Sequence, residues 1–134
     1  MKNRKELLLS TRDAATLAAS FRGRAAPGST EYEHVEWFDE LVSVARLLPG
    51  AVGDHVVALG RPVTYIEQPT GVRHCVAFVA PAQAEPAAHR VSVLSPVGRA
   101  LLGQSVGARI AVNLPDHRIE HLEVIAVSNS EVES

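Results

Sequence analysis

The sequence is short of several features that define major classes of protein. It has a single cysteine among 134 residues, which excludes an internal disulfide and any metal site built from several cysteines. It has no run of about 20 uncharged apolar residues, the length that a membrane-spanning helix needs. Its first residues are charged, and the apolar run at residues 7–9 is too short for the core of a signal peptide. We therefore expect a cytoplasmic protein that contacts no membrane.

Aromatic side chains are also scarce, at 4% of the chain, whereas apolar residues make up 46%. This apolar content predicts a folded protein with a core of useful size. Valine, leucine, isoleucine and alanine must fill most of that core.

Net charge is small, at −2, but the charges are unevenly distributed. Residues 1–24 carry six basic and two acidic groups, and residues 25–50 carry five acidic groups and one basic group. The rest of the chain is mildly acidic, so we expect little affinity for free phosphate backbones. A protein partner fits this balance better than nucleic acid. The simplest interpretation of the two oppositely charged blocks is two solvated helix faces that attract each other.

Two amphipathic patterns predict a short, coiled-coil-like helical hairpin in residues 1–50. The first helix begins at Ser10, and Asp13 stands at the position that completes a capping box. The second helix begins at Thr30, and its apolar stripe extends to Leu48. A short connector between the helices predicts that they lie antiparallel and bury their stripes.

From residue 51 onward the pattern changes to strands, which predicts an α+β fold with a mostly antiparallel sheet. Ser95-Pro96 is a strong helix start, because serine caps a helix and proline fits its first position. Gly103 is expected to close this short helix. The predicted strands are residues 56–59, 63–67, 72–79, 91–94, 109–113 and 118–127. The predicted parts of the chain are the hairpin (1–50), a sheet domain (51–128) and a polar tail (129–134).

No arrangement of residues predicts a catalytic centre, a metal site or a cofactor. The carboxylates of the second helix could hold magnesium, but acidic helix faces are usually solvated. His117 and His121 could meet near a hairpin, but no third ligand accompanies them. Cys75 is next to His74 in a strand, where neighbours point to opposite faces, so we expect a small buried thiol and no nucleophile–base pair.

The most distinctive motif of the chain is at residues 91–115. A strand leads into Ser95-Pro96, a short helix that ends in Leu-x-Gly, a Val-Gly turn, and a strand that ends in proline. This order resembles the C-terminal domain of the Gre transcript-cleavage factors, and the resemblance extends over residues 51–127. Within that superfamily the chain is similar to the Rnk branch, the regulators of nucleoside diphosphate kinase. Members of that branch keep the FKBP-like C-terminal domain and carry a much shorter helical hairpin.

The resemblance implies that the partner is bacterial RNA polymerase. In the family, the FKBP-like domain docks on the rim of the polymerase secondary channel, and the hairpin points into the channel. The polymerase contacts carry over to Ser95, Pro96 and Arg99, which match the motif, and to Glu85 in the preceding loop. Ser95 and Pro96 are also explained as a helix cap, so their role at an interface stays open at this point.

The predicted hairpin departs from the Gre pattern in length and in its tip. A full-length Gre hairpin presents acidic residues that hold magnesium for RNA cleavage, whereas the tip here contains Arg22, Arg24 and no carboxylate. A helix of about 18 residues spans only about 27 Å, and two-metal chemistry needs carboxylates close to the reacting phosphate. We therefore expect a non-catalytic regulator of transcription elongation that competes with Gre factors. The basic tip could touch acidic polymerase surface or nucleic acid.

Two other functions stay open on the sequence. One is enzymatic, either residual RNA cleavage through Glu31 and Glu33 or prolyl isomerase activity. The scarcity of aromatic residues argues against the aromatic-lined pocket of an isomerase. The other is a module that binds a different protein through the exposed stripe of the hairpin.

Overall fold

The structure, a computed structural model, describes residues 7–21, 30–50, 52–53 and 55–128, with only the backbone described for residues 30–32. Two helices followed by a sheet with a further short helix confirm the predicted α+β class. The α-helices are α1 (Thr11–Ser20), α2 (Thr30–Val44) and α3 (Pro96–Leu101). The strands are β1 (Leu8–Ser10), β2 (Arg46–Leu48), β3 (Pro62–Gln68), β4 (Arg73–Val79), β5 (Arg90–Ser92), β6 (Arg109–Asn113) and β7 (Ile119–Val127).

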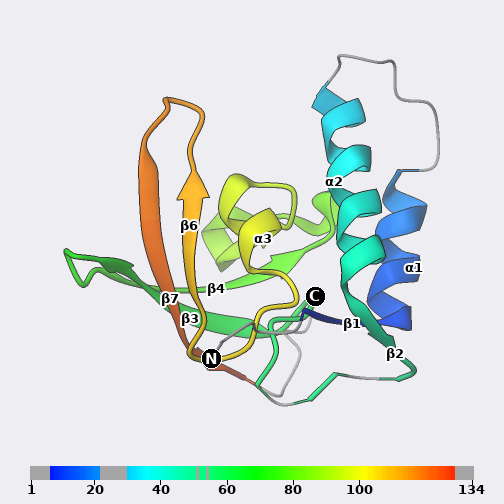
Figure 1. Ribbon diagram of the computed structural model, residues 1–134, viewed down its shortest axis with the longest axis horizontal. Coiled ribbons are helices and arrows are strands. Elements are labelled where there is room, and N and C mark those ends of the chain that lie inside the picture. Colours follow the sequence, from blue (N-terminus) through cyan, green and yellow to red (C-terminus); the bar gives the residue numbers. More distant parts are fainter. Residues whose placement is uncertain (1–6, 22–29, 51, 54, 129–134) are drawn as a thin grey trace.

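The larger sheet has five strands in the order β5-β4-β3-β7-β6. All its pairs are antiparallel except β4 and β5, which run parallel. The alternation of apolar residues along the predicted strands places Val63, Leu122 and Val124 on the face that α3 covers, and all three are fully buried. Two single turns of 3-10 helix, η1 (Pro81–Gln83) and η2 (Pro86–Ala88), lie between β4 and β5. Figure 1 shows α3 between the sheet and the two longer helices.

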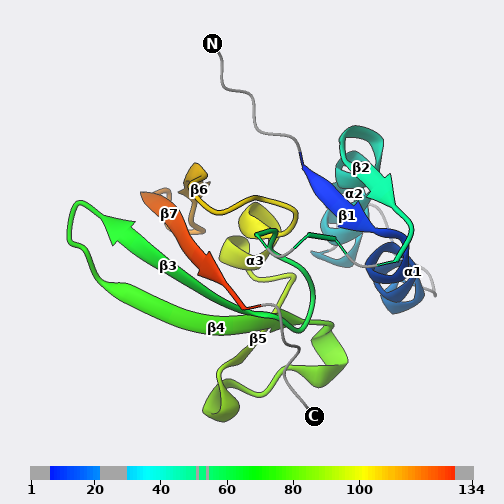
Figure 2. The ribbon, with the colours of Figure 1, turned by 90° about the horizontal axis from the view of Figure 1, so that it is seen from below.

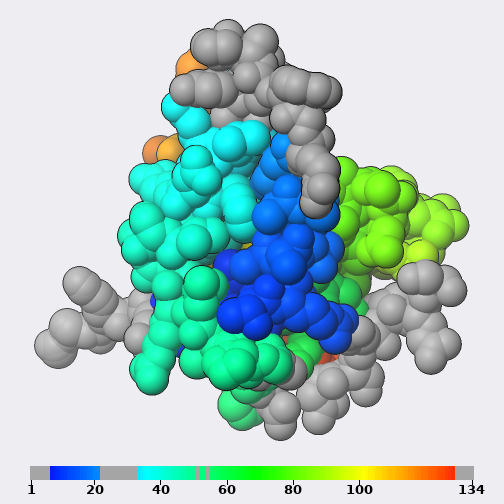
Figure 3. Space-filling view, turned by 90° about the vertical axis from the view of Figure 1, so that its right-hand side faces the viewer, coloured from blue at the N-terminus to red at the C-terminus, as the bar shows by residue number. Residues whose placement is uncertain are grey.

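The helices α1 and α2 lie side by side and run in opposite directions, as the colours in Figures 1 and 2 show. The rings of Phe21 and Phe38 meet between them, with centroids 5.5 Å apart. Together the two helices occupy the centre of the face of the molecule that Figure 3 presents, in blue and cyan. Residues 22–29, which include the predicted hairpin tip, lie outside the described residues. No helix in the described part of the chain is long and apolar enough to cross a membrane.

One continuous apolar core joins the helices to the sheet. Leu9, Leu17 and Leu41 from the helical part belong to the same buried cluster as Phe78 and Leu101 from the rest of the chain. Apolar burial of this kind is the main stabilising contribution to folding. The position of the helices relative to the sheet is therefore set by side-chain packing as well as by the connecting segment.

Buried hydrogen bonds reinforce this junction. The predicted cap of α1 is confirmed, since the Ser10 Oγ accepts a hydrogen bond from the Asp13 N–H at 2.9 Å. The Asp13 carboxylate, however, extends away from the cap and accepts a hydrogen bond from the Leu59 N–H at 3.1 Å. The Leu8 N–H donates to the Gly103 carbonyl at 3.0 Å.

The second helix ends earlier than predicted. The sequence pattern places Leu48 in this helix, but α2 ends at Val44 and residues 46–48 form β2, which pairs in parallel with β1. The Arg46 N–H donates to the Leu7 carbonyl at 2.8 Å, which draws the backbone out of the helix. The prediction was wrong because pairing with a segment about 40 residues earlier overrides the local helix pattern.

The predicted strand at residues 56–59 is also wrong. This segment is buried, but it forms only one isolated bridge, between Val56 and Ser105. The Val57 N–H donates to the Gln104 carbonyl at 2.9 Å, and the Val57 carbonyl accepts from the Gly103 N–H at 3.0 Å. The segment therefore bonds to the turn that follows α3, which is too irregular to form a strand pair.

Cys75 is exposed, which corrects the prediction of a buried thiol. The alternation along β4 was predicted correctly, with Cys75 paired to Thr64 and His74 paired to Tyr65 on the opposite face. The prediction was wrong about which face of β4 is buried, because no element in the described part of the chain packs over Cys75 on the outer face.

Candidate functional site

Ser95 and Pro96 begin α3 as the sequence predicts. The Ser95 Oγ accepts a hydrogen bond from the Gly98 N–H at 3.1 Å, and Pro96 occupies the first turn of the helix. The Ser95 N–H donates to the Ser92 carbonyl at 3.0 Å, which fixes the turn after β5. Both side chains stay partly exposed, so capping leaves some of their surface open to a partner.

Gly98 is a residue of this motif that the sequence analysis missed. A Cβ added at Gly98 would lie 2.6 Å from the Val93 carbonyl oxygen and 2.8 Å from the Val93 Cα. These Val93 atoms are backbone, just after the end of β5, so the close approach cannot be relieved by moving a side chain. A glycine inside a helix was the available signal, because glycine is unfavourable there without a packing reason.

Arg99 lies at the junction between α3 and α2. Its carbonyl accepts a hydrogen bond from the Trp37 Nε1 at 3.2 Å. The Arg99 side chain lines a hollow of about 240 Å³ together with Trp37 and Glu40. Its Nε is buried and has no hydrogen-bond partner among the described residues. The sequence assigned Arg99 to a partner surface, and the structure places it beside the helical part of the chain.

Glu85 lies in the exposed loop that contains η1 and η2. Its Oε1 pairs with the Arg90 guanidinium at 3.0 Å, and the carboxylate side chain is 61% exposed. The backbones of the two residues also exchange hydrogen bonds, at 2.8 and 3.1 Å. The loop is therefore fastened to the start of β5 and presents Glu85 to solvent.

The structure groups three of the four predicted contacts on one element. Ser95, Pro96 and Arg99 share the six residues of α3 and its cap, whereas Glu85 belongs to the loop before β5. No hydrogen bond or ion pair among the described residues joins Glu85 to α3. Arg22 and Arg24, the predicted tip residues, lie outside the described residues, as does the side chain of Glu31.

The candidate metal-binding residues do not come together in the described part of the chain. No group of three or more histidine, cysteine, aspartate or glutamate side chains there could hold an ion. Glu33, Glu36 and Glu40 follow one exposed face of α2. His117 sits in the turn after β6, while His121 is on β7 opposite Ala111.

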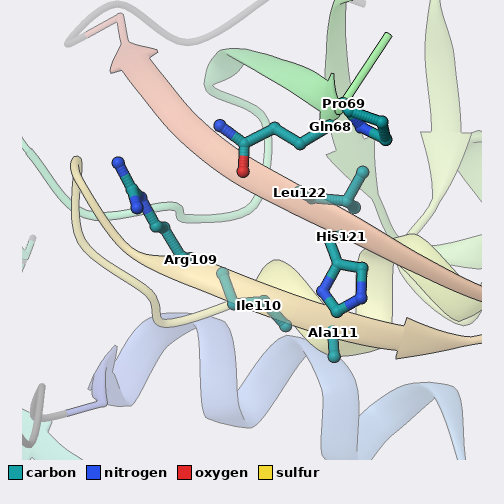
Figure 4. A pocket seen from close by; sticks show the side chains of 7 residues that line it. All are labelled: Gln68, Pro69, Arg109, Ile110, Ala111, His121 and Leu122. Carbon is teal, nitrogen blue, oxygen red and sulfur yellow. The ribbon is translucent and has the colours of Figure 1, made fainter. Parts of the chain in front are cut away.

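A hollow of about 390 Å³ on the sheet, shown in Figure 4, is lined by Gln68, Pro69, Arg109, Ile110, Ala111, His121 and Leu122. The Gln68 Nε2 donates to the Glu123 Oε1 at 3.1 Å, and the Arg109 Nε lies 3.8 Å from the same oxygen. Because its lining has no carboxyl, hydroxyl or thiol group, this hollow offers polar contacts and no acid–base pair for catalysis.

A polar cluster on the inner face of the sheet was not predicted. The His74 Nε2 lies 2.7 Å from the Glu67 Oε2, and the ring of His74 stacks on Tyr65 with centroids 5.0 Å apart. Burial, together with the nearby carboxylates of Glu120 and Glu67, raises the pKa of Tyr65 to about 12. Tyr65 is therefore a neutral phenol at physiological pH.

Comparison with known proteins shows which family the sheet domain resembles. Residues 52–129 match the model of the family described as transcription elongation factor, GreA/GreB, C-terminal domain. The transcription elongation factor GreA of Bacillus anthracis (strain CDC 684 / NRRL 3495) is 36% identical over 72 residues, which are 54% of this chain and 45% of that protein. GreA of Bacillus subtilis (strain 168) is 31% identical over 81 residues, or 60% of this chain and 52% of that protein. The chain spans about half the length of the curated relatives it matches.

A solved structure is similar over nearly the whole chain. The prokaryotic transcription elongation factor GreA/GreB from Nitrosomonas europaea superposes with a TM-score of 0.69 at 22% identity, covering 93% of this chain and 99% of that one. At this identity the likeness establishes the fold. It includes the helical part, which the family model does not reach.

Proposed function

The chain belongs to the GreA/GreB family of transcription elongation factors through residues 52–129, and from this premise we propose that it is a regulator of transcription elongation that binds bacterial RNA polymerase. It docks at the rim of the secondary channel through the surface around Ser95 and Pro96, and it competes there with Gre factors. The observation that carries the proposal is the α3 motif, whose cap leaves both residues partly exposed.

The docking surface is proposed to extend from α3 in two directions. Arg99 continues it toward α2, where its Nε is buried and lacks an acceptor among the described residues. Glu85 offers an exposed carboxylate from a loop that is anchored by Arg90. Charged groups at the rim of an interface mainly set its specificity and association rate.

We propose further that the protein is not catalytic and does not support transcript cleavage. The helices of 10 and 15 residues span about 15 and 22 Å. The sequence from residue 22 to residue 29 has no acidic residue with which to hold a metal ion, and Arg22 and Arg24 are proposed to face the polymerase instead. The short helices support a place in the Rnk branch, with an FKBP-like sheet and a stubby hairpin.

A binding titration with core RNA polymerase tests the docking surface. We expect micromolar or tighter binding that an added Gre factor displaces. The change Pro96→Glu leaves α3 capped, because an acidic residue suits the first turn of a helix. It should weaken binding about tenfold, the effect of losing about 1.4 kcal/mol. The control Ile119→Glu alters an exposed apolar residue of β7 and should bind normally. Absence of binding at micromolar concentration would remove the proposal.

A cleavage assay on stalled elongation complexes, with and without magnesium, tests the non-catalytic part. We expect no shortening of the nascent RNA, and less cleavage by a Gre factor when this protein is present in excess. Magnesium-dependent trimming by this protein alone would instead support a cleavage-stimulating factor. Binding to a different protein with no affinity for polymerase would support the interaction module.

A further inference from the structure

The strand β4 has a backbone edge that no other strand covers in the described part of the chain. β5 pairs only with residues 77–79 of β4, so the first half of β4 has a neighbour on the β3 side alone. Figure 2 shows β4 continuing past β5 toward the turn that joins it to β3. An uncovered strand edge presents unpaired N–H and C=O groups that can pair with another chain.

The direction of these groups follows from the hydrogen bonds around β4. The Glu67 N–H donates to the Val72 carbonyl at 2.8 Å, so even-numbered residues of β4 face β3. The Ala77 N–H donates to the His89 carbonyl at 3.0 Å on the opposite side, as expected for an odd-numbered residue. The N–H and C=O groups of Arg73 and Cys75 therefore point outward along the uncovered edge.

A hollow of about 540 Å³ runs along this edge. Residues 73–77 of β4 line it in unbroken succession, together with Pro62, Ala88 and His89. Successive residues of a strand point to opposite faces, so a hollow lined by five in a row lies beside the backbone and not over one face. Ala88 and His89 directly precede β5, so the hollow occupies the position that a longer β5 would fill.

The charges around the hollow favour an acidic occupant. Arg73 is exposed and makes no ion pair among the described residues, and His89 is exposed at the other end of the hollow, next to Ala77. The rest of the lining is largely small and apolar, from Pro62, Ala77 and Ala88. Opposite charges on adjacent strands stabilise their pairing, and small residues leave room for β-branched side chains.

We propose that the uncovered edge of β4 binds an extended peptide segment of a partner protein that carries acidic side chains beside apolar ones. The segment adds a strand to the sheet, with main-chain hydrogen bonds to Arg73 and Cys75 and an acidic side chain beside the Arg73 guanidinium. The lining of this hollow includes none of Glu85, Ser95, Pro96 and Arg99, although Ala88 and His89 belong to the same loop as Glu85. The inference rests on the edge of β4 and does not depend on the proposed docking to polymerase.

The opposite edge of the sheet provides an internal comparison. In β6, the bonds from the Leu114 N–H to the Arg118 carbonyl and from the Val124 N–H to the Ala108 carbonyl leave Ala111 facing outward. The hollow that includes β6 residues is smaller, at about 390 Å³, its lining also comes from β7 and the end of β3, and its Arg109 already lies 3.8 Å from Glu123. We therefore expect an acidic segment to select β4 over β6.

The test uses a fluorescein-labelled octapeptide of alternating valine and glutamate, titrated with the full chain and followed by fluorescence anisotropy. The change Cys75→Pro removes only an outward N–H, since edge strands tolerate proline at such positions. It should weaken binding about tenfold, as expected for one main-chain hydrogen bond of about 1.4 kcal/mol. Cys75→Ser retains the N–H and should bind like the parent. Arg73→Glu should weaken the acidic peptide and strengthen a valine–lysine octapeptide.

Two controls separate pairing at the edge of β4 from binding elsewhere on the protein. Ala111→Pro removes the matching outward N–H of β6 and should leave binding unchanged. On the unmodified protein, the same peptide N-methylated at alternate amides should not bind, and the bound parent peptide should slow amide exchange at Arg73 and Cys75. Equal binding by the N-methylated peptide, or an effect of Ala111→Pro as large as that of Cys75→Pro, would overturn the proposal.

Discussion

The sheet and the two longer helices differ in where their stabilising contacts lie. In the larger sheet, β3 is paired with a strand on each side, and α3 packs on the inner face of the sheet. Most of the contacts that these elements make are therefore with other elements of residues 55–128. α1 and α2 touch each other through Phe21 and Phe38, but their most buried side chains belong to the core shared with the sheet. Short isolated helices are marginal in water, and most of their stability comes from tertiary packing. The sheet should therefore hold its shape without the helices, whereas the helices need the sheet.

The largest effect is expected inside the sheet part. Gly98→Ala forces a Cβ to within 2.6 Å of the Val93 carbonyl oxygen, so either α3 or β5 must move. We expect a loss of about 3 kcal/mol in the free energy of unfolding, at the upper end for overpacking. Urea denaturation followed by circular dichroism measures it. Gly53→Ala, where an added Cβ meets nothing within 4 Å, is the control and should change stability little.

The next effect concerns the junction. Asp13→Ala removes the acceptor of the buried Leu59 N–H and should cost about 2 kcal/mol. Because the lost bond joins the two regions, α1 and α2 should unfold before the sheet. Urea titrations that follow Trp37 fluorescence and amide exchange of β3 should then separate into two transitions. Coincident transitions in this variant would contradict the view that the helices depend on the sheet.

A third test uses pH to probe the sheet alone. The pKa of Tyr65 is raised to about 12 in the folded protein, from 10.0 for an ordinary tyrosine. The folded state thus holds the phenol proton of Tyr65 more tightly than the unfolded state does. The stability that this proton contributes is complete below pH 10 and is lost as pH rises toward 12. At pH 11 the loss should be about 1.4 kcal/mol, the equivalent of one pKa unit. Tyr65→Phe should lack this part of the alkaline decline in urea titrations at pH 8 and pH 11.

The smallest effect distinguishes the two roles of Ser95. Ser95→Ala removes the cap of α3 and should cost about 1 kcal/mol, while Ser95→Asp keeps an acceptor for the Gly98 N–H and should cost little. Thermal unfolding measures both. If Ser95 also contacts polymerase, Ser95→Asp should bind less tightly despite its normal stability. Equal binding by Ser95→Asp and the parent would limit Ser95 to its role as a cap.

The elements predicted correctly are those with a local cause. Ser10 and Ser95 cap helices through bonds to residues three positions later, and the alternation in β4 and β7 correctly separates their side chains into two opposite faces. The errors in the elements of residues 1–59 arise from distant partners. Leu48 is not part of α2 because residues 46–48 pair with β1. The Asp13 carboxylate accepts a hydrogen bond from the Leu59 N–H, which the capping-box pattern does not predict.

In the candidate site, too, features with a local cause were predicted and features that depend on distant packing were not. The start of α3 could be read from Ser95-Pro96, whereas the turn of Arg99 toward Trp37 depends on how α2 packs. The exposure of Cys75 could not be read from β4 either, because alternation identifies two faces without saying which of them another element covers.

The parallel pairing of β1 with β2 holds the N-terminal end of α1 next to the C-terminal end of α2, close to Gly103. The contacts that anchor the pair, through Leu8, Asp13 and Trp37, do not involve the segment that connects the two helices. Equal insertions into both helices near that connection would lengthen the arm by about 1.5 Å per residue without disturbing its base. The length of the helix pair can thus change by mutation without changing the contacts that hold it on the sheet. Helix pairs of different length can therefore evolve on the same sheet domain.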